Sequence, residues 1–276
     1  MIGDFGKVIE IITSPANKKV KLAASLKQKK HRDETNLFIA EGIRLTEEAV
    51  KSNWQIEFCI CTAEALHNSR VAVILRMLEQ EKCDVYQVSK AIYDKISDTK
   101  EPQGILLVLQ KQQTQLATLE MSDNPLLIVL DELQDPGNVG TIIRTADAVG
   151  CQGIIIMKES VDLFAAKTVR ATMGSLFHVP IITEVSADTL LTFTDQHKIV
   201  LQVTALDHEA KEYFDSDFRD ATAIVFGNEG KGVSRVLLDA AKQKIFIPML
   251  GQSESLNVAT AAAVILYESF RQRRSS

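Results

Sequence analysis

Three stretches of the chain gather glycines, amides, hydroxyls and charged side chains at spacings that could support chemistry. They are DELQDPGNVGTIIRTADAVG (Asp131–Gly150), FGNEGKGVS (Phe226–Ser234) and IPMLGQSESLNVATAAAVILYE (Ile247–Glu268). Glycine-rich turns that follow apolar runs allow a backbone to approach a ligand closely. The second half of the chain therefore carries candidates for a ligand site.

The stretch FGNEGKGVS matches neither of the common phosphate-binding loops. A nucleotide-triphosphate loop requires G-x-x-x-x-G-K-[ST], but when Gly227 and Gly232 are aligned to its glycines, Val233 stands where the lysine belongs. The dinucleotide fingerprint G-x-G-x-x-G fails as well, because the three glycines read G-x-x-G-x-G. A purely structural turn between a buried strand and a helix remains an alternative for this stretch.

The first stretch predicts a helix that presents polar groups at its start. Asp135 can cap a helix that begins at Pro136, and Asn138 and Arg144 then project from the loop-to-helix region. A surface ion pair is the usual role of such an arginine. Its small and apolar sequence neighbours instead favour a partly buried guanidinium with a function.

The third stretch predicts a strand ending at Pro248, a loop, and a helix from about Leu256. The small residues Ala259–Ala263 are explained by close packing in the core. Core packing does not explain Ser253, Ser255 and Asn257, which are therefore candidate site residues.

Composition indicates an ordinary globular protein with neither a membrane span nor a metal site. The chain has 276 residues, 46% of them hydrophobic and 24% charged. No apolar run is long enough for a membrane helix, and the N-terminal MIGDFGKVIE does not resemble a secretion signal, so we expect a cytoplasmic protein. The four cysteines and five histidines show no zinc-ligand spacing, so no metal is expected.

One basic segment stands out from the net charge of −5 and is a candidate surface for RNA. Clusters of this kind bind phosphates through counterion release, although a solvated helix face is an equal alternative. We expect the segment to lie on a helix that starts at Ser14-Pro15. Its basic residues are Lys18, Lys19, Lys21, Lys27, Lys29, Lys30 and Arg32.

The order of apolar and helical segments predicts two α/β domains. Residues 1–110 alternate short apolar runs with helical stretches, residues 111–124 read as a polar, glutamine-rich linker, and residues 125–276 form a second alternation. The unalternated aliphatic strands of the second domain predict a mainly parallel sheet covered on both faces. Ligands bind such sheets at the carboxyl ends of the strands, where the loop after Phe226 lies.

The ordered set NVGTIIRTA, FGNEGKGVS and IPMLGQSESLNVATA resembles the three motifs of the SpoU (TrmH-type) RNA ribose methyltransferases of the SPOUT superfamily. The resemblance extends from about Pro125 to the end of the chain. The earlier stretches NLFIAEGIRLTEEAV and EPQGILLVL resemble the small ribosomal-protein-like RNA-binding domain that precedes the catalytic domain in many members.

The resemblance implies methyl transfer from S-adenosylmethionine (AdoMet) to a ribose 2′-hydroxyl of RNA, by a homodimer with a C-terminal trefoil knot. It further implies catalytic or holding roles for polar side chains of the three motifs, which are Asn138, Arg144, Glu229, Ser255 and Asn257. It places the methyl donor against the residues Thr204, Ala205, Gly227, Ile247, Pro248, Met249 and Leu256.

Three other functions stay open at this stage. The fold could serve a non-catalytic RNA-binding or ribosome-assembly protein, although the full set of polar motif residues argues against a lapsed enzyme. The methylated RNA could be transfer RNA, but an N-terminal RNA-binding domain favours ribosomal RNA. A conventional nucleotide-binding enzyme is disfavoured because both phosphate fingerprints fail.

Overall fold

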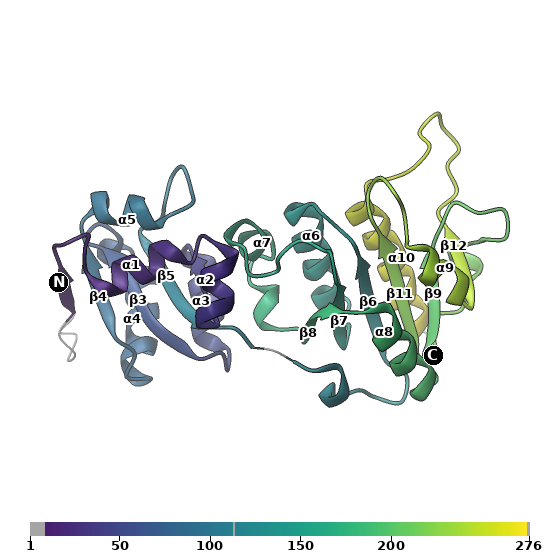
Figure 1. Cartoon of the computed structure of the whole chain (residues 1–276), viewed down its shortest axis with the longest axis horizontal. Helices are drawn as coiled ribbons and strands as arrows, with labels where there is room; N and C mark the ends of the chain where they lie inside the picture. The colour runs from purple at the N-terminus through teal and green to yellow at the C-terminus, as the bar shows by residue number, and fades with distance from the viewer. Residues whose placement is uncertain (1–8, 113, 275–276) are drawn as a thin grey trace. The chain divides into compact units, whose positions relative to one another are not determined.

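The computed structural model of the chain describes residues 9–112 and 114–274 (Figure 1). These residues divide into two compact units, one of residues up to 112 with 164–177 and the other of residues 113–163 with those from 178 onward. Parts of the predicted ranges that fall on residues 1–8, 113 and 275–276 lie outside the described residues. The predicted α/β class is confirmed, because each unit combines one sheet with helices.

The first unit has a five-stranded mixed sheet of order β1-β4-β3-β5-β2. Strands β1, β4 and β3 are parallel to one another, and β5 is antiparallel to both β3 and β2. Its strands are β1 Glu10–Ile12, β2 Leu37–Glu41, β3 Ile56–Thr62, β4 Val85–Val88 and β5 Ile105–Gln110.

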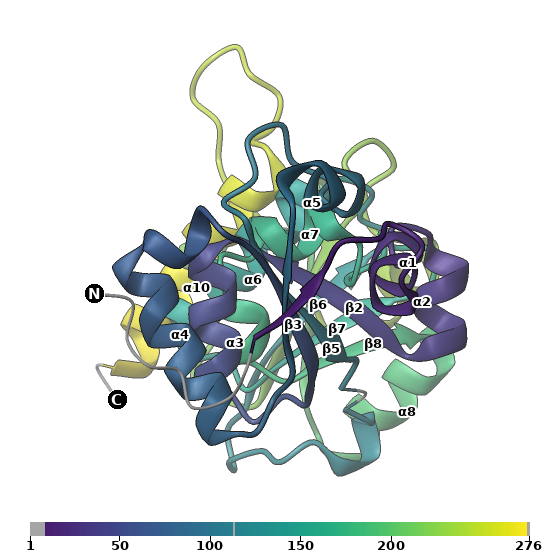
Figure 2. The ribbon, with the colours of Figure 1, turned by 90° about the vertical axis from the view of Figure 1, so that its left-hand side faces the viewer.

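Helices cover both faces of this sheet. Figure 2 shows α3 and α4 on one side of the strands and α1 and α2 on the other. The core between α1, α5 and the sheet contains Val20, Phe58, Tyr93 and Leu106, all buried. The helices of the unit are α1 Lys18–Ser25, α2 Lys29–Thr35, α3 Ile43–Lys51, α4 Ser69–Gln80, α5 Lys90–Ile96 and α7 Ala166–Ala171.

The predicted start of the basic helix at Ser14-Pro15 is wrong. Ser14 and Pro15 instead form a turn in which the Asn17 N–H donates to the Ser14 carbonyl at 3.2 Å. The Asn17 side chain then caps α1 by accepting from the Lys19 N–H at 2.8 Å, as an N-cap asparagine does. The basic segment also occupies two helices, α1 and α2, rather than one.

The second unit has a seven-stranded sheet of order β10-β12-β9-β11-β6-β7-β8. Every pairing in it is parallel, which confirms the mainly parallel sheet predicted from the aliphatic strands. Its strands are β6 Leu126–Asp131, β7 Gly153–Met157, β8 Ile181–Val185, β9 Val200–Thr204, β10 Lys211–Glu212, β11 Thr222–Gly227 and β12 Gln243–Phe246.

Four helices pack against this sheet. Helices α6 and α10 contact each other, while α8 and α9 share an apolar core with the strands that includes Val129, Leu190, Val225 and Leu237. The helices are α6 Pro136–Ala148, α8 Ala187–Gln196, α9 Arg235–Ala240 and α10 Val258–Arg274. The trefoil knot implied by the family resemblance stays a prediction. Among the described residues, no helix is both long and apolar enough to cross a bilayer.

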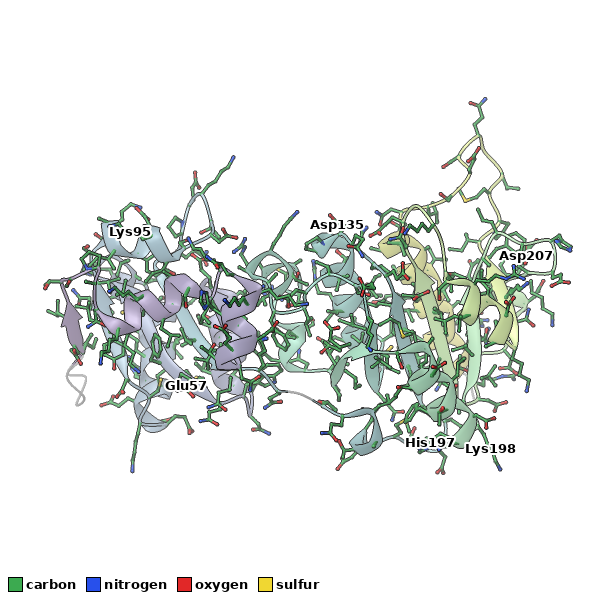
Figure 3. All side chains as sticks on the ribbon, in the orientation of Figure 1. Glu57, Lys95, Asp135, His197, Lys198 and Asp207 are labelled. Atoms are coloured by element: carbon green, nitrogen blue, oxygen red, sulfur yellow. The ribbon has the colours of Figure 1, made fainter. Side chains whose placement is uncertain are left out.

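The carboxyl ends of the central strands lie along one edge of the second unit. Asp135, which follows β6, and Asp207, which follows β9, lie at this edge in Figure 3. His197 and Lys198, which precede β9, lie at the opposite edge. The three motif stretches all follow or precede strand ends at the first edge, so the parallel sheet brings them together.

Candidate functional site

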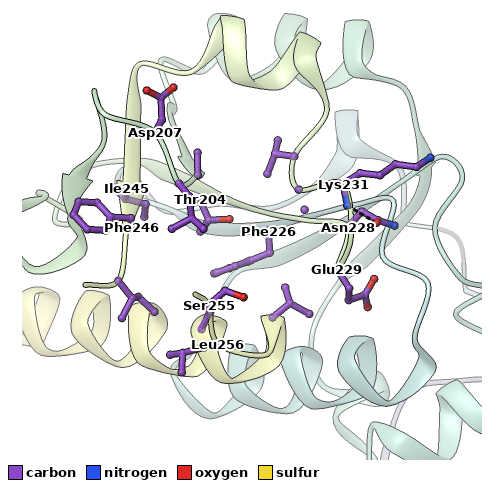
Figure 4. A pocket seen from close by; sticks show the side chains of 18 of the residues that line it. Thr204, Asp207, Phe226, Asn228, Glu229, Lys231, Ile245, Phe246, Ser255 and Leu256 are labelled. Carbon is purple, nitrogen blue, oxygen red and sulfur yellow. Dashed lines mark hydrogen bonds between the residues drawn. The ribbon is translucent and has the colours of Figure 1, made fainter. Parts of the chain in front are cut away.

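A cavity of about 710 Å³ lies beside the carboxyl ends of β9, β11 and β12 (Figure 4). Residues 204–207 and 226–233 line it, together with residues from the end of β12 to the start of α10. Its walls combine apolar side chains such as Phe226, Ile245 and Leu256 with the polar groups of the glycine loop. The volume and the mixed lining suit a small ligand with an aromatic part and a charged part.

Gly227 lets the glycine loop fold back onto its own stem. A Cβ atom at this position would lie 2.3 Å from the Val233 nitrogen and 2.4 Å from the Gly232 carbonyl carbon. The Gly232 N–H closes the loop by donating to the Asn228 carbonyl at 2.9 Å. A glycine is therefore required here because the backbone of Gly232 and Val233 leaves no space for a side chain. The sequence predicts a different reason for this glycine, namely that the missing Cβ leaves room for a ligand.

Two side chains hold the glycine loop in place, Asn228 within the loop and Asp131 at the end of β6. The Asn228 Oδ1 accepts from the N–H groups of Gly230 at 2.9 Å and Lys231 at 3.0 Å, while its Nδ2 donates to the Glu132 carbonyl at 2.8 Å. Buried Asp131 accepts from the Ser234 N–H at 2.7 Å. These contacts tie the loop to the end of β6, so its backbone is fixed before any ligand binds.

A chain of hydrogen bonds joins the three motif stretches. The Asn257 Nδ2 donates to the Asn138 Oδ1 at 3.0 Å, and the Asn138 Nδ2 donates to the Glu229 Oε1 at 2.9 Å. The Asn257 Oδ1 in turn accepts from the Ala259 N–H at 2.9 Å and so caps α10. The predicted association of these residues from three separate stretches is therefore present in the structure.

Hydrogen bonds keep the Glu229 carboxylate ionised. Partial burial alone would raise its pKa, but the hydrogen bond from Asn138 and those from the backbone N–H groups of Gln134 and Asp135 outweigh burial. The pKa of Glu229 therefore lies below its ordinary value of 4.5. Glu229 also lies at the N-terminus of α6, where the helix dipole favours a negative charge.

The cavity contains most of the predicted donor-binding residues. The predicted donor-binding residues that line it are Thr204, Ala205, Gly227, Ile247, Met249 and Leu256. The predicted catalytic residues Glu229, Ser255 and Asn257 line it as well. Pro248 is not a lining residue, and Asn138 reaches the site only through its hydrogen bonds. Nearly all the predicted set is thus gathered in one place.

Arg144 departs from the expectation of partial burial. It lies on α6 but is exposed, and its guanidinium makes no hydrogen bond or ion pair with the described residues. The apolar positions around it in sequence, Ile142 and Ile143, face the core instead. Neighbours in sequence point in different directions on a helix, so an apolar setting in the sequence did not imply a buried arginine.

The basic segment contains buried, partly buried and exposed side chains, and some of the exposed ones make contacts, since the Lys27 Nζ donates to the Ser97 carbonyl at 2.8 Å. Arg32 is only 4% exposed, and its Nη1 donates to the carbonyls of Leu26 at 2.7 Å and Lys27 at 2.9 Å, so its predicted place on an RNA-facing surface is wrong. Lys19 lies over the Phe58 ring at 4.6 Å. The exposed members of the segment are Lys18, Lys21, Lys27, Lys29 and Lys30.

Several residues that build the site were not predicted from the sequence. Asn228 stood inside a recognised motif, and its position two residues before Gly230 could have suggested the turn that its side chain stabilises. Asp131 gave no comparable signal, because its role depends on the pairing of β6 with β11. Asp207 and Glu254 also line the cavity and lie in loops without a pattern. Within the described ranges, no cluster of histidine, cysteine or acidic side chains could hold a metal ion.

Two family models match successive parts of the chain. Residues 125–267 match the model described as the SpoU rRNA Methylase family, and residues 17–107 match the MRM3-like substrate binding domain.

Similar curated proteins cover nearly the whole chain. The 23S rRNA (guanosine(2553)-2′-O)-methyltransferase RlmP of Bacillus subtilis is 34% identical over 93% of this chain and 97% of its own length. The 23S rRNA (uridine(2479)-2′-O)-methyltransferase of Streptomyces viridochromogenes is 27% identical over 91% of this chain and 88% of its own length.

Solved structures show the same fold with the methyl donor bound. The AdoMet-bound rRNA methyltransferase of Sinorhizobium meliloti is 31% identical, with a TM-score of 0.86 over 95% of this chain and 98% of that one. AviRb of Streptomyces viridochromogenes in complex with AdoMet is 27% identical, with a TM-score of 0.85 over 94% and 100% of the two chains. On its three motifs, its fold and these matches, the chain belongs to the SpoU rRNA methylase family.

Proposed function

We propose that this protein transfers a methyl group from AdoMet to a ribose 2′-hydroxyl of ribosomal RNA. The observation that carries the proposal is the chain of hydrogen bonds from Asn257 through Asn138 to Glu229 at the edge of the cavity. It joins all three family motifs in one site. Relatives of nearly full length that methylate 23S rRNA at the 2′-oxygen support the same reaction and substrate.

The cavity fits AdoMet in size and chemistry. Phe226, Ile245 and Leu256 offer an apolar surface for an adenine ring, while the carboxylates of Glu229 and Glu254 offset the positive charge of a sulfonium. The glycine loop presents a fixed backbone wall. When bound, AdoMet supplies an electrophilic methyl group.

The nucleophile is a ribose hydroxyl, which is weak until its oxygen gains negative charge. A guanidinium stays protonated at physiological pH and cannot act as the base. We therefore assign Arg144 to binding the neighbouring phosphate and stabilising the charge that develops on the oxygen. As the new O–CH3 bond forms and the sulfur–carbon bond breaks, the hydroxyl proton passes to that phosphate or to solvent.

Asn138, Glu229 and Asn257 orient the site in this scheme. Because the carboxylate only accepts hydrogen bonds, it fixes which end of the Asn138 amide faces it, and Asn138 then fixes the Asn257 amide. The glycine loop and the starts of α6 and α10 are thereby held in one arrangement. Such positioning accounts for much of the acceleration expected when two reactants are brought together.

The first unit supplies the RNA-binding surface in our proposal. Its match to an MRM3-like substrate binding domain and the exposed lysines of α1 and α2 support this role. Lys18 and Lys21 lie on one helix without an acidic residue in its first turn, so their charge is available to phosphates.

A homodimer with a composite active site completes the proposal. Arg144 is exposed on α6, next to the small exposed residues Thr141 and Ala148, and Tyr267 on α10 is 53% exposed. A second copy packed on α6 and α10 would cover these side chains and bring Arg144 to a donor site of its partner. An enzyme that acts on ribosomal RNA works where ribosomes are assembled, and we place it in the cytoplasm.

The proposal is tested by mapping 2′-O-methylated nucleotides in total RNA from cells with and without this protein. We expect one ribosomal RNA position to lose its methyl group when the protein is absent. Loss of a methyl group from a transfer RNA position instead would identify transfer RNA as the substrate. An unchanged methylation map, together with no calorimetric binding of AdoMet, would favour a non-catalytic RNA-binding protein.

A further inference from the structure

An ion-pair cluster holds the segment that follows β9. Residues 204–207 line the cavity, and they leave the sheet at the carboxyl end of β9. The Lys244 Nζ on neighbouring β12 lies 2.6 Å from Asp207 Oδ2 and 3.2 Å from Glu209 Oε2. One lysine therefore bridges two carboxylates of the loop between β9 and β10.

The contact between Lys244 and Asp207 is the more sheltered of the two. Their side chains are 22% and 26% exposed, whereas the Glu209 side chain is 67% exposed. The hydrogen bond between them lowers the pKa of Asp207 and raises the pKa of Lys244. Both groups therefore stay charged across the neutral range, and solvent screens this pair less than the outer one.

Asp207 also organises the backbone of its own loop. Its Oδ1 accepts from the Glu209 N–H at 3.0 Å, and its carbonyl accepts from the Ala210 N–H at 3.0 Å. Before the turn, the Ala205 N–H donates to the Ile245 carbonyl at 3.0 Å. The loop is thus fastened to β12 through its backbone at residue 205 and through the Asp207 side chain at its turn.

The Asp207 carboxylate does not face the interior of the cavity. In Figure 4 it points away from Thr204 and Phe226. Lys244 is not a lining residue at all. The pair is therefore placed to shape the wall rather than to contact a ligand directly.

We propose that Lys244 is a positioning residue that, by holding Asp207, keeps the wall of residues 204–207 in the shape that binds the methyl donor. This inference rests on the proposed function, because it assigns the donor to this cavity. Removing either partner of the pair frees the loop, and each donor molecule that binds must then order it again, which weakens binding.

The test measures AdoMet affinity by calorimetry in Lys244→Met, Asp207→Asn, the double variant and Lys244→Arg. We expect each single loss to raise the Kd about three- to tenfold, the scale of one charged hydrogen bond in a partly exposed site. The double variant should lose less donor affinity than the sum of the two single losses, because the two substitutions share the contact between Lys244 and Asp207. Lys244→Arg should retain donor affinity close to that of the wild type.

Two further measurements separate positioning from general stability. In steady-state kinetics, Lys244→Met should raise the KM for AdoMet and leave the KM for RNA and the kcat at saturating AdoMet unchanged. Arg235→Met breaks an ion pair with Asp239 on α9, 3.0 Å long and between exposed side chains outside the cavity lining, and serves as the matched control. It should leave the AdoMet Kd unchanged.

Equal AdoMet Kd values for the wild type, Lys244→Met and Asp207→Asn would overturn the inference and leave the proposed function standing. Asp207→Asn alters only a loop side chain, so it keeps the question answerable if Lys244→Met fails to fold. Absence of AdoMet binding by the wild type would instead overturn the proposed function.

Discussion

At the scale of single residues, donors and acceptors determine the orientation of the site. Each described contact of the Glu229 carboxylate comes from an N–H group, so the ionised form is the one that fits. The amides of Asn138 and Asn257 then have one orientation each. In such a site, a substitution that puts an N–H donor where an oxygen acceptor stood breaks the hydrogen bonds. Substitutions of this kind therefore test the role of each residue.

The role of Arg144 is tested by Arg144→Ala. We expect kcat for RNA methylation to fall about 10²- to 10³-fold, because a group that stabilises developing charge is removed. The Kd for AdoMet should not change, since Arg144 does not line the cavity. Arg235→Ala, at another exposed arginine of the same unit, is the control. Unchanged turnover in Arg144→Ala would remove this residue from the mechanism.

The role of Glu229 is tested by Glu229→Gln. The new amide presents an NH2 group to N–H donors, so we expect methyl transfer to fall about a hundredfold through loss of positioning. The contacts are partly exposed to solvent, so the free energy of unfolding should fall by only about 1 kcal/mol.

The pH dependence of this effect has a definite sign. The folded pKa of Glu229 lies below 4.5, so its stabilisation is fully present above that ordinary value and is lost as the pH falls through the lowered pKa. Urea unfolding at several pH values should show the difference between wild type and Glu229→Gln shrinking only on the acid side. A difference that stayed constant down to strongly acidic pH would contradict this assignment.

Some of these residues could be predicted from sequence and others could not. Asn138, Glu229 and Asn257 were identifiable because each stands in a recognisable motif, and the structure joins them by hydrogen bonds. The prediction that Arg32 faces RNA was wrong because a run of basic residues does not show which side chain turns inward and donates to backbone carbonyls. Lys244 carried no signal, because its partner on the next loop is brought to it only by strand pairing.

At the scale of elements, the parallel strands and the glycine loop build the cavity together. The unalternated aliphatic runs of the second domain predicted its mainly parallel sheet, of which β7 Gly153–Met157 is one strand. Short elements such as β10 could not be predicted from the sequence. A two-residue strand such as β10 has no periodicity of its own and exists because β12 offers it an edge.

The glycine loop is tested by comparing Gly227→Ala with Gly251→Ala. A Cβ atom at Gly227 would lie 2.3 Å from the Val233 nitrogen, whereas one at Gly251 would meet nothing within 4 Å. We expect Gly227→Ala to lower the free energy of unfolding by about 1–3 kcal/mol through overpacking, and to weaken AdoMet binding. Gly251→Ala should do neither. Equal behaviour of the two variants in thermal unfolding and calorimetry would contradict the structural role of Gly227.

At the scale of the whole molecule, the chain passes between its two units more than once. Residues 164–177 lie within the sequence range of the SpoU match, yet they belong to the first unit. There Phe164 packs on Phe38 with ring centroids 5.0 Å apart, and Phe177 packs on Trp54 at 5.3 Å. Arg170 also pairs with the buried Glu41 at 3.7 Å.

A fragment of residues 1–112 tests this two-segment construction. Without residues 164–177 it exposes the aromatic surface around Phe38 and Trp54. We therefore expect the fragment to bind a hydrophobic dye and to unfold without cooperativity. In the full chain, Phe164→Ala should lower the free energy of unfolding by about 3 kcal/mol. A fragment that unfolds cooperatively with the stability of the intact first unit would show that the second segment is dispensable.

This division could not have been predicted from sequence. The predicted boundaries followed the polar stretch at residues 111–124, and composition gave no sign that a helix within the later residues packs on the earlier ones. In the structure, Leu116 and Leu119 of that stretch are buried in the core of the second unit. Contacts between residues distant in sequence set these features, and a local pattern does not record them.

The central claim is tested most directly by incubating the purified protein with isotopically labelled AdoMet and large-subunit ribosomal RNA, and then digesting the RNA to nucleosides. Methyl transfer to ribose predicts label in a single 2′-O-methylated nucleoside at one position. The account would be contradicted if the RNA stayed unlabelled or if the label were found only on a base.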